Sequence, residues 1–237
     1  MPKYEKDILI IIPTLNEVKS IFTLISDIFI HFPEIHILVV DDGSNDGTIN
    51  LLSKSQILHK NLIIINRGKK LGLGSAYRSG FNYAITHNYD FIIQMDGDGS
   101  HQVNDLAKLI HAESNYDLVI GSRYISGGKI EGWKSHRKII SKFGNIFAKK
   151  ILNLKTNDTT SGFKRLSKKI FENKIILNSK TNGYGFQVEI INVAENNEFS
   201  ILELPITFID RKFGSSKFDF FIILEAFINI TKWAIRK

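Results

Sequence analysis

The chain has 237 residues, 43% of them hydrophobic, which is enough for one substantial core at the upper end of single-domain size. It contains no cysteine, which excludes a disulfide framework, a thiolate zinc site and a cysteine nucleophile. The net charge of +7 is uneven, because residues 1–118 carry 10 Lys and Arg against 14 Asp and Glu, whereas residues 119–237 carry 21 against 10. The acidic half suits a metal ion and the basic half suits phosphate groups.

Three kinds of phosphate-bearing partner fit the basic half: nucleic acid, an anionic membrane surface or a phosphorylated substrate. Nucleic acid is disfavoured, because the basic residues are not interleaved with aromatic residues in a repeated module. The N-terminus is charged and leads directly into an apolar segment, without the basic start, apolar run and cleavage site of a signal peptide. We therefore expect a cytosolic protein.

Strand-like and helix-like segments alternate through the first half of the chain. Residues 8–12 are consecutive aliphatics, typical of a buried strand, and residues 18–32 place apolar side chains at helical spacing. The pattern repeats, with further strands predicted at 35–40, 62–65 and from 91, and helices at 49–58 and 75–86. This alternation requires a mostly parallel sheet with right-handed crossovers, so the polar loops after the strands share one edge. We expect an α/β fold whose active face is that edge.

The second half is less regular. The sequence predicts a strand at 118–121, a Gly-rich loop at Ser126-Gly127-Gly128, a helix with basic and apolar faces at 138–152, and a strand at 201–209 interrupted by Pro205. Residues 218–235 are rich in Phe and Ile, and a polar stripe at helical spacing indicates an amphipathic helix rather than a membrane span. Packing on the core and docking on a bilayer or a membrane-bound partner both remain open. We divide the chain into a main domain, 1–217, and this helix, 218–237.

The strand that begins at residue 91 ends abruptly in Asp96-Gly97-Asp98. Two carboxylates one residue apart repel each other unless positive charge lies between them, and a hard divalent cation carrying phosphate oxygens is the usual solution. Gly97 and Gly99 remove side chains that would block close approach of a ligand. The alternative is a solvated Asp-Gly turn that closes a hairpin.

Two other loops after strands carry weaker signals. Asp41 and Asp42, at the end of the second strand, offer carboxylate acceptors for the N–H edge of a base or for ribose hydroxyls; a turn with a helix N-cap is the alternative and would not account for these two residues. Gly72-Leu73-Gly74-Ser75-Ala76-Tyr77 imitates a dinucleotide-binding fingerprint, but Tyr77 replaces the third glycine and the motif follows the third strand instead of the first. A nicotinamide-dependent oxidoreductase is therefore disfavoured.

Eight segments taken in order resemble the dolichol-phosphate mannosyltransferase group, inverting family 2 glycosyltransferases with the GT-A fold. They cover nearly the whole chain, and the last four separate this group from other family 2 enzymes. The segments are Pro13-Thr14-Leu15-Asn16-Glu17, Asp41-Asp42-Gly43-Ser44, Arg67-Gly68-Lys69 with Leu71-Gly72, Met95-Asp96-Gly97-Asp98, Gly121-Ser122-Arg123-Tyr124, Arg137 with Ser141 and Gly144-Asn145, Thr160-Ser161-Gly162-Phe163-Lys164, and 211–217.

The resemblance implies a role for each matching residue. Donor-binding positions are Pro13, Leu15, Glu17, Val40, Asp42, Asp96, Gly97, Asp98, Arg211 and Lys217. Asp96 and Asp98, with Ser100, match the site of a Mg²⁺ or Mn²⁺ ion that binds the diphosphate. Arg123, Arg137 and Ser141 match the site of the lipid acceptor's phosphate, and paired guanidiniums suit a dianion. Asp98, Arg123 and Arg137 are the catalytic candidates.

The implied reaction moves a hexose, with mannose from GDP-mannose favoured, onto a polyprenyl phosphate such as dolichyl phosphate at the cytosolic face of a membrane. The acceptor is already an anion, so we nominate no general base. Three departures from the family pattern bear on binding: Leu15 replaces a common aromatic, Gly97 replaces Ala, and Ser100 replaces a Gln that often helps to bind the metal. His101 is interpreted as a loop or helix-start residue, not a ligand.

Two alternatives stay open. One is a family 2 enzyme that uses UDP-glucose or another donor, or that builds a polysaccharide. The other is a non-catalytic, membrane-associated subunit with a degraded metal site, against which the retention of Asp96 and Asp98 argues.

Overall fold

The central strand, β1 (Ile8–Thr14), shows how the apolar pattern builds the sheet. The computed structural model describes residues 5–211 and 220–235. Successive side chains of a strand point to opposite faces. Accordingly Ile8, Ile10 and Ile12 enter one hydrophobic cluster, whereas Leu9 and Ile11 enter a second cluster on the other face. A strand buried on both faces is what five consecutive aliphatics predict.

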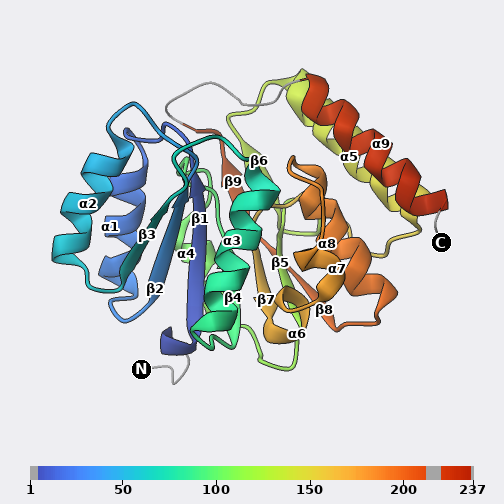
Figure 1. The fold of residues 1–237 in the computed structure, drawn as a ribbon. Helices are drawn as coiled ribbons and strands as arrows, with labels where there is room; N and C mark the ends of the chain where they lie inside the picture. Colours follow the sequence, from blue (N-terminus) through green and yellow to red (C-terminus); the bar gives the residue numbers. More distant parts are fainter. Residues whose placement is uncertain (1–4, 212–219, 236–237) are drawn as a thin grey trace.

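The strands of the first half are parallel and confirm the predicted order of strand and helix. β2 (His36–Asp41) pairs with β1 and with β3 (Leu62–Asn66), and β4 (Phe91–Gln94) pairs with the other side of β1. The intervening helices are α1 (Ile21–His31), α2 (Thr48–Leu58) and α3 (Leu73–Thr86). Figure 1 shows α3 crossing the sheet on its way from β3 to β4.

The direction of strand addition reverses between β1 and β4. Right-handed crossovers place α1 and α2 on one face while the sheet grows from β1 to β3, and α3 on the other face because the chain then returns past β1. Buried residues agree: Ile25 of α1 and Leu52 of α2 belong to one cluster, and Phe81 of α3 to the other. Ligands of open α/β sheets bind outside the carboxyl ends of the strands at this reversal.

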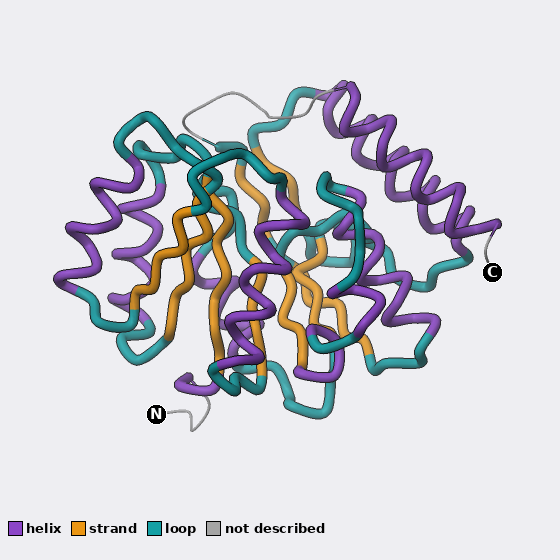
Figure 2. The backbone as a smooth tube through the Cα atoms, in the orientation of Figure 1, coloured by secondary structure: helices purple, strands orange, loops and turns teal. Residues whose placement is uncertain are grey.

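The second half adds an antiparallel strand that the sequence analysis missed. Within the described residues the sheet has seven strands in the order β3-β2-β1-β4-β7-β5-β8, and β7 (Lys164–Ser167) runs antiparallel between β4 and β5 (Leu118–Ser122). The interruption at Pro205 is confirmed: β8 (Ile201–Pro205) extends this sheet, while β9 (Thr207–Ile209) forms a separate pair with β6 (Lys129–Glu131). Figure 2 shows the strands as one central layer between helices.

Four further helices complete the cover of the sheet. They are α4 (Val103–Ile110), α6 (Lys168–Phe171), α7 (Lys174–Leu177) and α8 (Gly185–Asn196). No element was assigned to the α8 segment from sequence, because its ten consecutive buried residues, 185–194, include Gln187, Glu189 and Asn192 and show no amphipathic alternation.

Helices α5 (Ser135–Leu152) and α9 (Phe220–Ile235) lie side by side at one end of the molecule, as Figure 1 shows. Phe147 of α5 and Phe227 of α9 contact each other with ring centroids 4.4 Å apart, and Ile230 is buried. α9 also packs closely on α8, because Gly185 brings the backbone of α8 against Ala226. One face of the amphipathic helix thus packs on the core. Among the described residues no helix has the length and apolar character needed to cross a membrane.

Candidate active site

The acidic part of the site follows β4, beside the reversal of strand order. Asp96 and Asp98 lie in the loop between β4 and α4, and each faces a basic side chain. His101 Nε2 lies 3.5 Å from Asp96 Oδ2, and Arg211 Nη2 lies 3.2 Å from Asp98 Oδ2. Burial raises the pKa of the Asp96 carboxyl, but the hydrogen bond and charge of His101, with the charges of Arg211 and Arg123, outweigh it and leave that pKa below its ordinary value.

His101 has a more specific environment than its position in the sequence suggested. It precedes α4, as predicted for a helix-start residue, but its side chain is buried. The imidazole stacks on Phe163 with ring centroids 4.5 Å apart and meets the edge of Phe208 at 5.3 Å. These two rings fix the imidazole beside Asp96.

Ser100 and Gly97 complete the loop. The backbone N–H of Ser100 donates to Asp98 Oδ1 at 3.0 Å, while the buried Ser100 Oγ has no hydrogen-bond partner among the described residues. At Gly97 an added Cβ would lie 3.2 Å from both Ile12 and Thr14, so the missing side chain lets the loop pack against β1. Packing is thus a reason for Gly97 besides the predicted close approach of a ligand.

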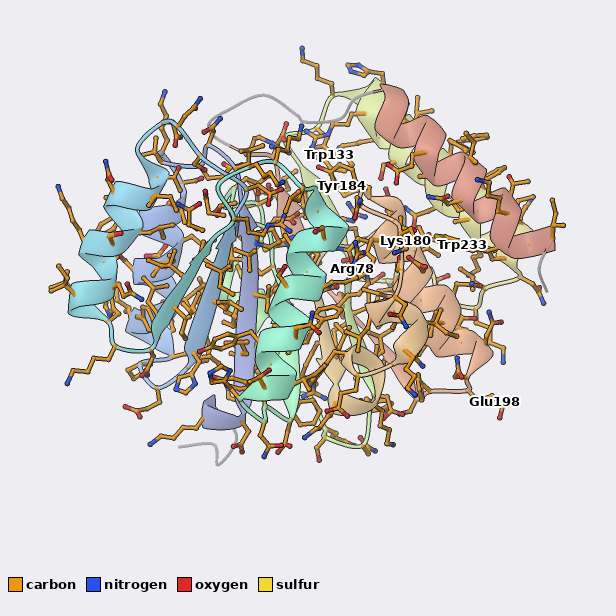
Figure 3. All side chains as sticks on the ribbon, in the orientation of Figure 1. Arg78, Trp133, Lys180, Tyr184, Glu198 and Trp233 are labelled. Atoms are coloured by element: carbon orange, nitrogen blue, oxygen red, sulfur yellow. The ribbon has the colours of Figure 1, made fainter. Side chains whose placement is uncertain are left out.

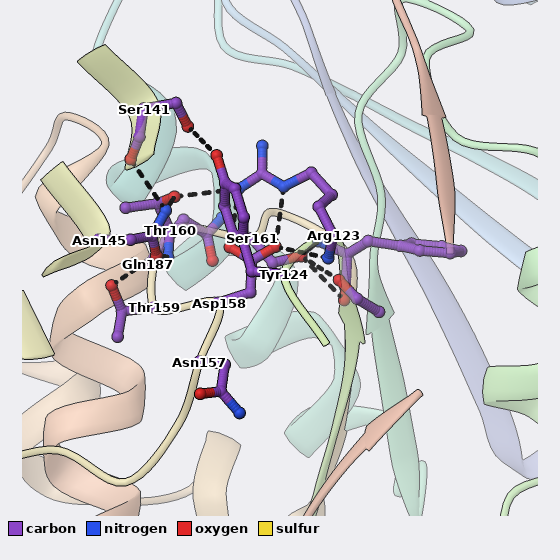
Figure 4. Close-up of polar contacts among 12 residues, drawn as sticks. Arg123, Tyr124, Ser141, Asn145, Asn157, Asp158, Thr159, Thr160, Ser161 and Gln187 are labelled. Atoms are coloured by element: carbon purple, nitrogen blue, oxygen red, sulfur yellow. Dashed lines mark hydrogen bonds and ion pairs between the residues drawn. The ribbon is translucent and has the colours of Figure 1, made fainter. Parts of the chain in front are cut away.

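The basic part of the site is built on the end of β5. Asp158 accepts hydrogen bonds from Arg123 Nε at 2.8 Å and from Arg123 Nη2 at 2.7 Å, and Nη2 also donates to Thr160 Oγ1 (Figure 4). The Asp158 charge and its hydrogen bonds raise the pKa of Arg123, although burial acts in the opposite direction. Arg123 is therefore a fixed cation with its orientation set by protein groups.

Two further predicted residues lie on α5. Ser141 Oγ accepts a hydrogen bond from the Tyr124 hydroxyl at 2.9 Å, which leaves its own proton available to a ligand (Figure 4). Arg137 Nη1 donates to Asp210 Oδ1 at 2.7 Å, and its guanidinium lies 4.2 Å from the centre of the Trp133 ring. Ser141 and Arg137 are thus each held by one neighbouring side chain, and both keep hydrogen-bonding capacity for a ligand.

One cleft joins these acidic and basic parts to an apolar wall. Asp96, Asp98, Arg123, Arg137, Ser141 and Arg211 all line it, so the structure brings together six of the predicted site residues. The wall continues along α5, α8 and α9, and Figure 3 labels two lining residues, Trp133 and Tyr184. Its apolar side chains are those of Leu73, Trp133, Ile140, Phe143, Phe147, Val188, Phe208, Ala226, Phe227 and Ile230.

The remaining predicted donor residues lie outside the lining of this cleft, at the carboxyl ends of β1 and β2. They are Pro13, Leu15, Glu17, Val40 and Asp42; Gly97 and Ser100, in the loop after β4, also lie outside the lining. Asp42 is engaged by protein groups: one carboxylate oxygen pairs with Arg67, and the other accepts the backbone N–H groups of Leu71 and Gly72 at 3.1 and 2.9 Å. Asp42 thus shapes the 67–72 loop. Lys217 lies outside the described residues.

Residues 9–174, well over half of the chain, match the family model described as glycosyl transferase family 2. The chain belongs to glycosyl transferase family 2. Two similar curated proteins are the polyprenol monophosphomannose synthase of Mycolicibacterium smegmatis, 36% identical over 96% of this chain and 87% of that protein, and the undecaprenyl-phosphate mannosyltransferase of Micrococcus luteus, 36% identical over 96% of this chain and 94% of that protein.

Solved structures agree with a GT-A fold for this family 2 chain. One is glucosyl-3-phosphoglycerate synthase from Mycobacterium tuberculosis in complex with UDP, with a TM-score of 0.69 and 16% identity over 96% of this chain and 79% of that one. The same enzyme with Mn²⁺, UDP-glucose and phosphoglyceric acid gives a TM-score of 0.67 at 17% identity, with the same coverage. At these sequence identities, the structural similarity shows a shared fold only.

The sequence analysis missed several groups that shape the family 2 cleft. Asp158 and Thr160 orient Arg123, and Tyr184 and Gln187 line the cleft from the start of α8. Asp158 and Thr160 carried a signal, because they stand in the polar segment before β7, in or beside a motif of the resemblance. Tyr184 and Gln187 carried none, because the cleft depends on how α8 packs.

Proposed function

We propose that this family 2 enzyme transfers a mannosyl residue, with GDP-mannose as the favoured donor, to a polyprenyl phosphate and inverts the sugar carbon. The observation that carries the proposal is the single cleft that joins two carboxylates, a set of arginines and an apolar wall. The carboxylates suit a nucleotide sugar, the arginines suit the acceptor phosphate, and the apolar wall suits the lipid chain. The names of the two mannosyltransferase relatives support the same sugar and acceptor class.

The residues after β4 fit a divalent cation. Asp96, Asp98 and Ser100 offer hard oxygen donors of the kind that Mg²⁺ and Mn²⁺ prefer, and the Ser100 Oγ is buried without a partner among the described residues. No three His, Asp or Glu side chains of the described chain are grouped to hold a metal unaided, so the donor's diphosphate would supply further oxygens. Bound there, the cation would stabilise negative charge on the leaving nucleoside diphosphate.

Arg123, Arg137 and Ser141 would hold the acceptor phosphate. Each guanidinium already has one edge fixed by a carboxylate, Asp158 or Asp210, so ordering it on a phosphate costs little extra conformational entropy. A phosphate oxygen of the acceptor then attacks the sugar carbon while the bond to the diphosphate breaks on the opposite side. Because the phosphate is already anionic, no side chain has to remove a proton.

Arg211 would act on the leaving group. It lines the cleft 3.2 Å from Asp98, where its charge can stabilise the diphosphate as the sugar departs. The resemblance places Lys217 with Arg211 among the donor-binding residues. Pro13, Leu15, Glu17, Val40 and Asp42 would contact the nucleoside beside β1 and β2.

We further propose that the enzyme binds peripherally to the cytosolic face of a membrane, directly or through a membrane-bound partner. Large apolar side chains are exposed on α5 and α9, and lysines flank them, as a helix lying in an anionic interface requires. The apolar residues are Ile139, Ile140, Phe143, Ile146, Ile228 and Ile235, and the lysines are Lys138, Lys142 and Lys232.

The deciding experiment compares donors and acceptors directly. The purified protein is incubated with GDP-mannose or UDP-glucose, with Mg²⁺, Mn²⁺ or EDTA, and with farnesyl phosphate in detergent, and the sugar in the lipid product is measured. Thermal shifts with each nucleotide report donor binding independently. We expect metal-dependent mannosyl transfer. Transfer from UDP-glucose but not from GDP-mannose would identify UDP-glucose as the donor. Nucleotide binding without any transfer would favour a non-catalytic subunit.

A further inference from the structure

Gly144 stands in the middle of α5, where a glycine needs a reason. A glycine inside a helix costs about 1 kcal/mol relative to alanine. Other glycines of this chain have a structural cause: Gly72 has a φ of +95°, and at Gly121 an added Cβ would lie 2.7 Å from Phe163. Gly144 has helical backbone angles, and no heavy atom outside its own helical turn lies within 4 Å of the position of a Cβ. Protein packing therefore does not require glycine here.

The open space beside Gly144 is the cleft itself. Gly144 lines the cleft together with Ile140 and Phe147, which share its face of α5 at spacings of four and three residues. Across the cleft stand Phe227 and Ile230 of α9. The space is thus a slot with apolar walls and a floor of bare helix backbone.

The slot lies next to the residues that would hold the acceptor phosphate. Arg137, Ser141 and Gly144 follow one another at positions i, i+4 and i+7 on the face of α5 that lines the cleft. Ser141 and Gly144 are separated by a rise of about 4.5 Å along the helix axis. This is comparable to the four-carbon backbone of one isoprene unit. A phosphate held at Arg137 and Ser141 therefore places the first unit of its lipid chain at Gly144.

We infer that Gly144 determines acceptor specificity by leaving room between α5 and α9 for the phosphate-proximal isoprene unit, whose methyl branch occupies the space that a side chain would fill. The inference rests on the proposed function. The aromatic rings of Phe147 and Phe227 contact each other, with centroids 4.4 Å apart, and would pack on one side of this branched unit. An unbranched alkyl chain needs no such space.

Binding and turnover are measured for Gly144→Ala and Gly144→Leu, with Lys150→Leu as the control that places the same leucine side chain at an exposed position of α5. Farnesyl phosphate and dodecyl phosphate are the two acceptors. Their binding is followed by tryptophan fluorescence, since Trp133 lines the cleft, so the result does not depend on catalysis. The thermal shift caused by GDP-mannose reports the donor site separately.

We expect Gly144→Ala to raise the melting temperature, because alanine is the better helix former. Gly144→Leu should weaken farnesyl phosphate binding about tenfold, equivalent to the burial of about two methylene groups, and leave the donor shift unchanged. Dodecyl phosphate binding should change less. Lys150→Leu should match the wild type in its affinity for farnesyl phosphate, its affinity for dodecyl phosphate and the thermal shift caused by the donor.

Wild-type affinity for farnesyl phosphate in Gly144→Leu would overturn the inference, as would an equal loss for both acceptors or a loss of the donor shift. If Gly144→Leu does not fold, Gly144→Ala decides. A lower affinity of this variant for farnesyl phosphate but not for dodecyl phosphate supports the inference. An affinity for farnesyl phosphate equal to that of the wild type overturns it. Failure of the wild type to bind either acceptor would overturn the proposed function as well.

Discussion

Asp158 holds Arg123 through three hydrogen bonds inside the wall of the cleft. The carboxylate accepts from Nε at 2.8 Å, from Nη2 at 2.7 Å and from the backbone N–H of Arg123 at 2.9 Å. Both side chains are buried, with 0% and 8% of their surface exposed. Burial raises the pKa of Asp158, but the Arg123 charge and hydrogen bonds outweigh it, and the pKa lies below its ordinary value.

Asp158→Asn should lower the free energy of unfolding by about 3–5 kcal/mol at pH 7, because it leaves a buried guanidinium without its counter-charge. The pKa of Asp158 is depressed on folding, so its stabilisation is present above the ordinary Asp value near 4 and is lost as the pH falls below it. Urea unfolding at several pH values should show the difference between wild type and variant shrinking on acidification. Glu34→Gln, which removes a half-exposed partner of Lys6, is the control and should change stability by less than about 1 kcal/mol.

Lys164 predicts a pH dependence in the alkaline range. Its ammonium is fully buried, donates to Ser161 O and to Gln187 Oε1, and burial lowers its pKa to about 7. Because the unfolded chain keeps its proton to higher pH, stability should rise between pH 7 and about 10 by at most about 1.4 kcal/mol per pH unit. The measured quantity is the difference in unfolding free energy between wild type and Lys164→Met across this range. A difference that stays flat across this range would contradict the prediction.

Asn145 uses its whole hydrogen-bonding capacity to tie α5 to the 159–160 segment. Its Nδ2 donates to Ser141 O at 3.1 Å and Thr160 Oγ1 at 2.9 Å, and its Oδ1 accepts from Thr159 Oγ1 at 2.9 Å and Thr160 N at 3.2 Å (Figure 4). Asn145→Ala should therefore cost about 2 kcal/mol of stability and raise the KM for the acceptor more than that for the donor. Asn196→Ala removes one partly buried hydrogen bond within α8, to Asn192 outside the cleft lining, and should leave both KM values unchanged. Equal rises in both KM values for Asn145→Ala would show general damage to the site.

Substitutions of Asp98 and of Arg137 should distinguish the donor part of the site from the acceptor part. Asp98→Ala should lower kcat by about 10²–10³-fold, since it removes a group that stabilises charge in the transition state. Arg137→Ala should raise the acceptor KM by about 10- to 100-fold, as expected for one charge-assisted hydrogen bond, without changing the thermal shift caused by the donor. Arg78→Ala is the matched control, because its guanidinium binds Thr181 O and Asn182 outside the cleft lining. Loss of the donor shift in Arg137→Ala would show that the site is divided differently.

Local patterns in the sequence were sufficient for the first half of the fold. Consecutive aliphatics at 8–12 and 35–40 report burial on both faces, and the spacing of Ile21, Leu24, Ile25, Ile28 and Phe29 reports a helix with one buried face. Those signals predicted parallel strands, and hence polar loops collected at one edge. They also singled out Asp96 and Asp98 as the end of a buried strand.

Long-range packing decided the rest. The β7 segment, Lys-Arg-Leu-Ser, has no alternation or apolar run, and it becomes a central strand because β4 and β5 offer it unpaired backbone groups on both sides. His101 lies beside Asp96 because Phe163 and Phe208, distant in sequence, pack on its ring. The sequence by itself therefore determined which residues are candidates for the site, namely the acidic loop and the arginines. Only the tertiary structure decided that one cleft joins them to α5 and α9, because local periodicity reports burial but carries no information on which distant surfaces meet.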